Sequence, residues 1–129
     1  MSVRHVNPDG MHRSPAFSQA VVVEQPRKTI YIGGQNGVGA DGRPVGPTMG
    51  EQARQTFLNL RTILESEGAT LADIVHWRIA VLEGQSFEEG LAAFQEVWNR
   101  EDPPPAITVH TVTGLNPGCL VEIDAVAAL

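Results

Sequence analysis

The chain has 129 residues, with 9 Lys and Arg against 15 Asp and Glu, and a formal net charge of −6 at pH 7. This length can bury one sizeable core, so we expect a single domain spanning residues 1–129. The acidic balance argues against a nucleic-acid partner and against an anionic membrane surface. No stretch is long and apolar enough for a membrane span or a secretory signal, and the one cysteine excludes an internal disulfide framework. The expected location is cytoplasmic.

The first third of the chain predicts an irregular start followed by a β-hairpin. Residues 1–16 hold two prolines and a glycine, and no regular element is expected there. Residues 17–24 and 29–33 are rich in β-branched residues, and the turn-forming residues 25–28 separate them. We therefore predict that the two runs pair as a hairpin. The glycine-rich residues 33–47 predict a long loop.

Two capping boxes mark the expected starts of two helices. Thr48-x-x-Glu51 begins the first, Gly68 is expected to end it, and its apolar residues recur at helical spacing at Ala53, Phe57, Leu60 and Leu64. Ser86-x-x-Glu89 begins the second, whose expected buried stripe is Leu91, Phe94 and Trp98. The prolines at 103–105 cannot continue this helix.

Between the two helices, residues 74–82 predict a third strand with two unlike faces. Side chains two apart in a strand point the same way. One face is apolar and is expected to be buried: Val75, Trp77, Ile79 and Val81. The other face carries His76, Arg78 and Ala80.

The last quarter of the chain predicts two strands, within 103–112 and 119–127, joined by a turn-rich connection. One face of the final strand is wholly apolar: Cys119, Val121, Ile123, Ala125 and Ala127. We therefore expect a buried and unreactive thiol at Cys119. Glu122 and Asp124 share the other face, roughly 7 Å apart. This pair is typical either of a solvated sheet face or of carboxylates in a cleft.

The predicted order is ββαβαββ, which favours a two-layer α+β sandwich with both helices on one face of a mixed sheet. The opposite sheet face mixes apolar with charged residues: Leu120, Val126 and Ala80 beside Glu122, Asp124 and Arg78. Such a face is too apolar to stay wet and too polar for a core. We expect other subunits to close it.

Several motifs together resemble one known family. They are Asn-Pro-Asp-Gly at 7–10, Ser-Pro-Ala-Phe-Ser-Gln-Ala-Val at 14–21, Ile-Tyr-Ile-Gly-Gly-Gln at 30–35, Pro-Ala-x-Thr-Val at 105–109, and Leu-x-Pro-Gly-x-Leu-Val-Glu-Ile-Asp-Ala-Val-Ala at 115–127. The chain resembles the Rid (reactive intermediate deaminase) family, also called YjgF-like or L-PSP endoribonuclease-like. The resemblance implies a chorismate-mutase-like fold and a homotrimer with three clefts between neighbouring subunits.

The resemblance also implies a chemistry, from which this sequence departs. Rid deaminases hydrolyse enamines and imines to ketoacids and ammonia, with an arginine binding the substrate carboxylate and a cleft glutamate placing or activating water. Ile107 stands at the arginine position, and an isoleucine cannot supply bidentate donors to a carboxylate. The resemblance is therefore to a subgroup without the catalytic arginine, and 2-iminobutanoate deaminase activity is not expected.

Other cleft positions have lost polar groups as well. Phe17 stands for the family tyrosine, Gly33 for a serine, Val109 for a cysteine and Leu91 for an asparagine. Glu122 is the polar residue that remains, and it is the candidate general base or hydrogen-bond acceptor. Backbone N–H groups near Gly34 and Gly118 could still bind an oxygen.

Three functions remain open from the sequence. The chain could hydrolyse an imine-like small molecule with altered specificity, it could bind a ligand or partner without turnover, or, less favoured by its charge, it could cleave RNA. No motif predicts a cofactor, and the four histidines lack metal-ligand spacing. Arg78, Arg13 or His110 could in principle replace the missing arginine.

Overall fold

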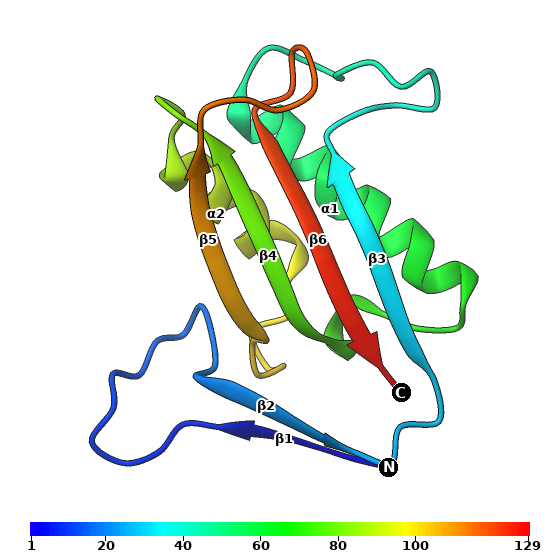
Figure 1. Ribbon diagram of the computed structural model, residues 1–129, viewed down its shortest axis with the longest axis vertical. Helices are drawn as coiled ribbons and strands as arrows, with labels where there is room; N and C mark the ends of the chain where they lie inside the picture. The colour runs from blue at the N-terminus through cyan, green and yellow to red at the C-terminus, as the bar shows by residue number, and fades with distance from the viewer.

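The computed structural model describes all 129 residues. Two helices cover one face of a four-stranded sheet, and a separate two-stranded ribbon lies beside it (Figure 1). The elements in chain order are β1 (Ser2–Val6), β2 (Ala20–Glu24), β3 (Thr29–Asn36), α1 (Met49–Ser66), η1 (Leu71–Asp73, a 3-10 turn), β4 (Ile74–Leu82), α2 (Phe87–Val97), β5 (Ala106–Val112) and β6 (Val121–Ala128). The predicted α+β class, with both helices on one face, is confirmed.

The main sheet has the order β3-β6-β4-β5 and mixes both pairings. β6 is antiparallel to β3 and to β4, whereas β4 and β5 are parallel. A parallel pair needs a crossover, and α2 supplies it. β6 lies between two neighbours, so its helix-facing residues are shielded all round. Val121, Ile123, Ala125 and Ala127 are all buried, as predicted.

The predicted N-terminal hairpin and the predicted irregular start are wrong. β2 pairs with β1, with Val3 opposite Val23, and β3 pairs with β6. β1 is five residues long and two of them are charged or titratable, so its pattern is too weak to stand out in the sequence. Pairing of β3 with β6 is favourable because it buries Ile32 in the main core. The observed order therefore has one more strand than ββαβαββ.

Helix α1 follows its prediction closely. The Thr48 hydroxyl accepts a hydrogen bond from the Glu51 N–H at 3.2 Å, and Gly68 adopts the positive φ of +73° that follows a helix end. The expected stripe is buried: Ala53, Phe57, Leu60 and Leu64. The stripe packs onto the sheet and supplies the centre of the core.

Two side-chain placements differ from expectation. In α2, Ala93 is buried and Leu91 is 45% exposed, because Leu91 lies at an edge of the helix rather than over the sheet. In β4, the register shifts between Ile74 and His76. This bulge brings Ile74 rather than Val75 into the core.

An aromatic cluster joins both helices to β4. Phe57 and Trp77 lie 5.6 Å apart between ring centroids, Trp77 and Phe94 also 5.6 Å, and Trp77 and Trp98 5.7 Å. The rings are tilted or edge-to-face, a geometry worth about 0.5–1.5 kcal/mol per pair beyond area burial. The cluster fixes the distance between the helices and the sheet.

Gln52 of α1 holds two long loops against the body of the protein. Its side chain is buried, donates to the carbonyls of Gly46 and Gly118 at 2.9 Å each, and accepts from the Leu120 N–H at 2.8 Å. One loop precedes α1 and the other precedes β6. A single side chain therefore sets the position of both.

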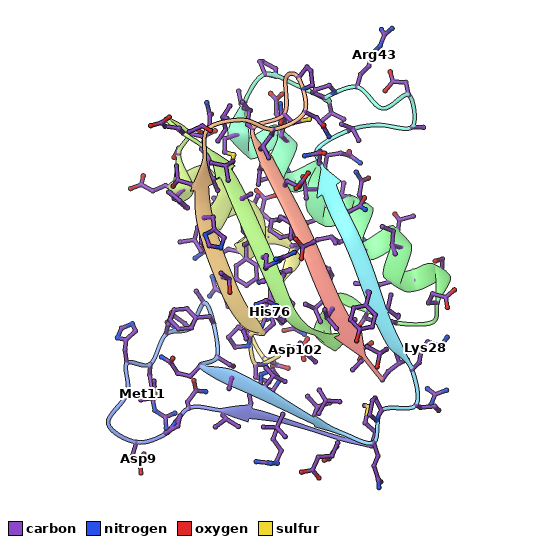
Figure 2. All side chains as sticks on the ribbon, viewed as in Figure 1. Asp9, Met11, Lys28, Arg43, His76 and Asp102 are labelled. Atoms are coloured by element: carbon purple, nitrogen blue, oxygen red, sulfur yellow. The ribbon has the colours of Figure 1, made fainter.

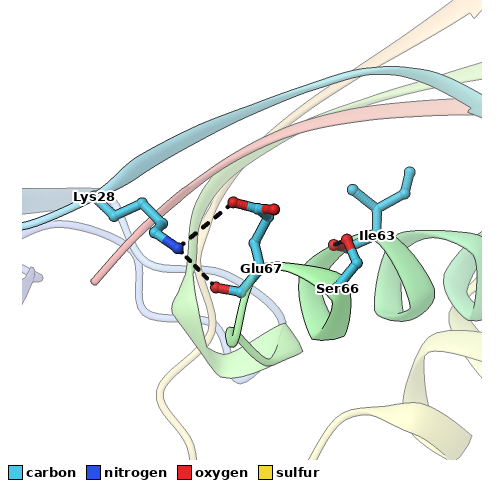
Figure 3. A network of polar contacts seen from close by, with 4 residues as sticks. All are labelled: Lys28, Ile63, Ser66 and Glu67. Carbon is cyan, nitrogen blue, oxygen red and sulfur yellow. Dashed lines mark hydrogen bonds and ion pairs between the residues drawn. The ribbon is translucent and has the colours of Figure 1, made fainter.

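Polar contacts connect the residue before edge strand β3 to the C-terminal end of helix α1. Lys28 donates to the Glu67 carbonyl at 3.0 Å and lies 3.5 Å from its carboxylate (Figure 3). A cation near a helix C-terminus is favourable because the last carbonyls carry partial negative charge. Elsewhere, Asp9 of the loop between β1 and β2 and Arg43 of the loop before α1 point away from the main sheet (Figure 2).

Candidate functional site

An apolar pocket of about 200 Å³ lies between the sheet and the two helices. Its floor comes from the helix-facing side of β4, β5 and β6, and its walls come from α1, α2 and the segment before β2. Fifteen of its sixteen lining residues are hydrophobic. They include four predicted site residues: Phe17, Leu91, Ile107 and Val109.

Strand geometry places the two β5 residues in this pocket. Ile107 and Val109 are two apart and so share a face, and they lie opposite Trp77 and Ile79 of β4. The crossover through α2 brings Leu91 to the rim of the same pocket. Val109 and Leu91 remain 46% and 45% exposed, so the pocket is open at this rim.

Phe17 reaches the pocket because its neighbour is fastened to the loop before β5. Ser18 is buried, its N–H donates to the Pro105 carbonyl at 3.0 Å, and its hydroxyl donates to the Pro104 carbonyl at 2.6 Å. His5 Nδ1 lies 3.0 Å from the same Pro104 oxygen. We call Ser18, His5 and Pro104 the Ser18 clasp. It explains why the strand expected from residue 17 begins only at Ala20.

The pocket contains no charged side chain. None of its sixteen lining residues is ionisable, and the only N–H donor among the side chains is the Trp77 indole, whose Nε1 is buried without a partner. A carboxylate placed here would lose its hydration without gaining a charged partner. The pocket therefore favours neutral, apolar ligands.

The cations considered as substitutes for the arginine that the resemblance led us to expect lie elsewhere. Arg78 Nε donates to both carboxylate oxygens of Asp124, at 3.1 and 3.2 Å, and this hydrogen bond raises the pKa of Arg78. Arg13 donates to the Asn7 carbonyl at 3.0 Å. Neither residue lines the apolar pocket, and His110 does not line it either.

Glu122 lies on the other face of the main sheet. On β6 it is opposite Ala80 of β4 and Asn36 of β3, and it borders a shallow hollow of about 170 Å³ together with Arg78, His110 and Asp124. The predicted common face of Glu122 and Asp124 is thus confirmed. Within one chain, however, Glu122 and the apolar pocket are on opposite sides of the sheet.

The predicted glycines belong to the Glu122 side or to the loops. A Cβ on Gly34 would lie 2.8 Å from the Glu122 Cδ, so the carboxylate packs directly over this backbone. Gly33 faces open space beside it, at the register shift of β3. Gly118, with a φ of +79°, lies against Pro44, and its carbonyl accepts from Gln52. The structure therefore separates these residues from Phe17, Leu91, Ile107 and Val109.

Cys119 is buried as predicted. Burial raises the pKa of its thiol, and the nearby charge of Glu122 raises it further. A thiol held protonated is a poor nucleophile. Cys119 is therefore part of the packing rather than of the chemistry.

Sequence reasoning missed several residues of the pocket wall. Phe57, Trp77 and Phe94 were assigned to the core, and Met49, Phe87 and Gly90 were not singled out, although all of them line the pocket. Hydrophobic periodicity shows which side of a helix is buried. It does not show that the buried side chains leave a space between them.

Comparison with known proteins gives the family to which this fold belongs. The family model described as "Endoribonuclease L-PSP" matches residues 11–129. The chain belongs to this family. Neither helix of the structure has the length and apolar character needed to cross a membrane.

Individual relatives carry the Rid and deaminase names. "Protein mmf1, mitochondrial" of Schizosaccharomyces pombe is 34% identical over 120 residues, covering 88% of this chain and 72% of its own. The human 2-iminobutanoate/2-iminopropanoate deaminase is 30% identical over 112 residues, covering 86% and 78%. A Rid family protein from Yersinia pestis, YyfB, superposes over the whole of both chains with a TM-score of 0.86 at 33% identity. The assignment to the Rid family from sequence motifs is confirmed.

Proposed function

We propose that this Rid-family chain forms a homotrimer that binds a small, mostly apolar metabolite in clefts between neighbouring subunits. The observation that carries the proposal is the pocket lined by Phe17, Leu91, Ile107 and Val109, which is open, apolar and free of charge. Glu122 of a neighbouring subunit would supply a strong acceptor at its mouth. Assembly is required because one chain keeps Glu122 on the far side of its own sheet.

The amount of exposed surface supports assembly. The chain exposes 7454 Å², whereas a folded monomer of 13.9 kDa is expected to expose about 6,700 Å². Apolar groups contribute at the pocket rim, where Phe87 is 51% exposed. On the other sheet face Tyr31, opposite Val126 of β6, is 80% exposed. A neighbouring subunit would cover both regions.

The chemistry that fits the site is hydrolysis of an imine without a carboxylate. Water adds to the C=N carbon, and the resulting carbinolamine releases ammonia and leaves a carbonyl. Glu122 would accept the proton of the attacking water. The substrate in the name of the human relative is an anion at neutral pH, and Ile107 offers such an anion no partner.

Ammonia release tests the proposed specificity. 2-Iminobutanoate would be generated in situ by an amino-acid oxidase, with the human relative as positive control, and a carboxylate-free imine by a flavin amine oxidase. We expect this chain to accelerate only the second hydrolysis, and Glu122→Gln to remove that acceleration. Acceleration of 2-iminobutanoate hydrolysis by the unaltered chain, at the rate of the human relative, would contradict the proposal.

A matched pair of variants isolates the role of the missing charge. Ile107→Arg restores a guanidinium at the pocket and should give measurable acceleration with 2-iminobutanoate. Ile107→Met, similar in size to the original and uncharged, should give none. Equal behaviour of the two variants would show that a charge at this position does not decide the substrate.

Binding without turnover is the second candidate. It is favoured by the absence of any ionisable side chain in the pocket wall. It predicts a saturable thermal shift with a small apolar molecule, no product from either imine, and a changed affinity in Glu122→Ala. The ribonuclease in the family description is disfavoured by the net charge of −6, and RNA cleavage that is lost in Glu122→Gln would reinstate it.

A further inference from the structure

The few aromatic residues of this chain are concentrated around one pocket. The sequence contains 4 Phe, 2 Trp and 1 Tyr. All four phenylalanines and one tryptophan line the apolar pocket: Phe17, Phe57, Trp77, Phe87 and Phe94. They come from the segment before β2, from both helices and from β4. A chain poor in aromatic residues thus builds an aromatic wall in one place.

The pocket has the size of a single ring with a short substituent. Its volume is about 200 Å³. An apolar cavity of about 150 Å³ is enough to hold benzene. The remaining space admits a few more non-hydrogen atoms. The volume is therefore sufficient for one ring with a short substituent.

The arrangement of the rings favours an aromatic ligand over an aliphatic one. Trp77 lies 5.6 Å from Phe57 and 5.6 Å from Phe94, with interplanar angles of 52° and 75°. Tilted and edge-to-face contacts of this kind are favourable because the edge of one ring is positive and the face of the next is negative. An aromatic ligand can continue the same pattern, whereas a saturated ring has no such faces.

Charge and access complete the description of the ligand. No lining side chain is ionisable, so a carboxylate would be buried without a partner. The rim residues Phe87, Leu91 and Val109 are half exposed, which leaves an entrance between α2 and β5. A neutral molecule can enter there without losing a charged group's hydration.

We propose that this pocket binds a neutral molecule built on one aromatic ring and carrying no carboxylate. The proposal rests on the proposed function, which makes this pocket the ligand site, and it adds the chemical class of the ligand. It distinguishes an aromatic ring from an aliphatic group of the same size.

Three matched probes test the proposal on the 129-residue chain. Benzyl alcohol and cyclohexylmethanol have the same number of non-hydrogen atoms and the same hydroxyl group, and benzoate adds the charge. Binding is measured by saturation-transfer NMR and by intrinsic fluorescence, because Trp77 lines the pocket. We expect saturable binding of benzyl alcohol at least about tenfold tighter than that of the other two.

The outcomes separate this proposal from the one on which it rests. Cyclohexylmethanol binding as tightly as benzyl alcohol would overturn the aromatic class while leaving an apolar ligand site intact. Benzoate binding most tightly would overturn both. If neither benzyl alcohol nor cyclohexylmethanol binds saturably, both the aromatic class and the apolar ligand site are overturned.

Two variants, one inside and one outside the pocket, locate the binding. Phe17→Leu removes a ring from the pocket wall, and Arg61→Leu changes an exposed side chain of α1 that does not line the pocket. Loss of one aromatic contact should weaken benzyl alcohol binding about two- to tenfold in Phe17→Leu, with no change in Arg61→Leu. Phe87→Leu, at the exposed rim, gives the same test if Phe17→Leu folds poorly. Unchanged affinity in both pocket variants would overturn the assignment.

Discussion

Replacing Gln52 by leucine should destabilise the protein through its loops rather than through its core. The buried Gln52 side chain makes three hydrogen bonds to backbone groups, with Gly46, Gly118 and Leu120. Leucine has a similar volume but can neither donate nor accept. Gln52→Leu therefore leaves two carbonyls and one N–H without their partner.

The expected loss of stability follows from how well water can replace those partners. Gly118 is exposed and its carbonyl can be solvated, whereas Gly46 and Leu120 are half buried. A buried polar group left unpaired costs about 1–3 kcal/mol, and burying leucine instead of an amide offsets part of that cost. We expect a net loss of about 2 kcal/mol from two partly buried orphans.

Urea unfolding at fixed protein concentration measures this loss. With a slope of about 1–3 kcal/mol per molar urea, the midpoint should fall by about 1 M without a change in slope. Gln55→Leu is the matched control, because Gln55 lies on the same helix and bonds only the Asn59 side chain, at 2.8 Å. A midpoint in Gln52→Leu equal to that of the control would refute the idea that Gln52 holds the loops.

Three further predictions concern the residues around the site. Gly34→Ala would place a Cβ 2.8 Å from the Glu122 Cδ, so it should displace that carboxylate and reduce any Glu122-dependent activity with little loss of stability. Gly33→Ala, with open space around it, should leave both the activity and the stability unchanged. Ser18→Ala removes the hydroxyl of the Ser18 clasp and should lower the melting temperature. It should also weaken ligand binding, since the pocket residue Phe17 directly precedes Ser18. A lower melting temperature with unchanged ligand affinity would show that the clasp does not position the pocket wall. Cys119 should react with iodoacetamide far more slowly in the folded protein than in urea at pH 8, because burial raises its pKa. Because the thiol pKa is higher in the folded protein than in the unfolded chain, the protonated thiol contributes its full stability below the ordinary thiol pKa. This contribution is lost as the pH rises through the pKa of the folded protein. The free energy of unfolding of Cys119→Ala should therefore fall less steeply at alkaline pH than that of the unaltered protein.

The division of the predicted site between two sheet faces has a simple structural cause. Side chains alternate along a strand, and Glu122 follows Val121 and precedes Ile123, both of which face the helices. Any carboxylate at position 122 must therefore point to the opposite face. The pocket and the carboxylate can cooperate only between two copies of the chain, which makes the oligomeric state the first property to measure.

The sequence alone determined the elements whose periodicity is long and strong. The α1 stripe at Ala53, Phe57, Leu60 and Leu64 and the alternating run of β6 were predicted correctly, because each buries one complete face. The family motifs were also legible without a structure. They identified four residues that do line one pocket.

Only the tertiary structure decided the pairing of the strands and the existence of the pocket. β1 is too short and too polar to be recognised from the sequence, yet it pairs with β2, so that β3 pairs with β6 instead. The bulge that buries Ile74 and the exposure of Leu91 depend on neighbours far away in the sequence. The pocket is a gap left where side chains of six segments fail to fill the space between sheet and helices. Such a gap depends on packing in three dimensions that local patterns do not encode.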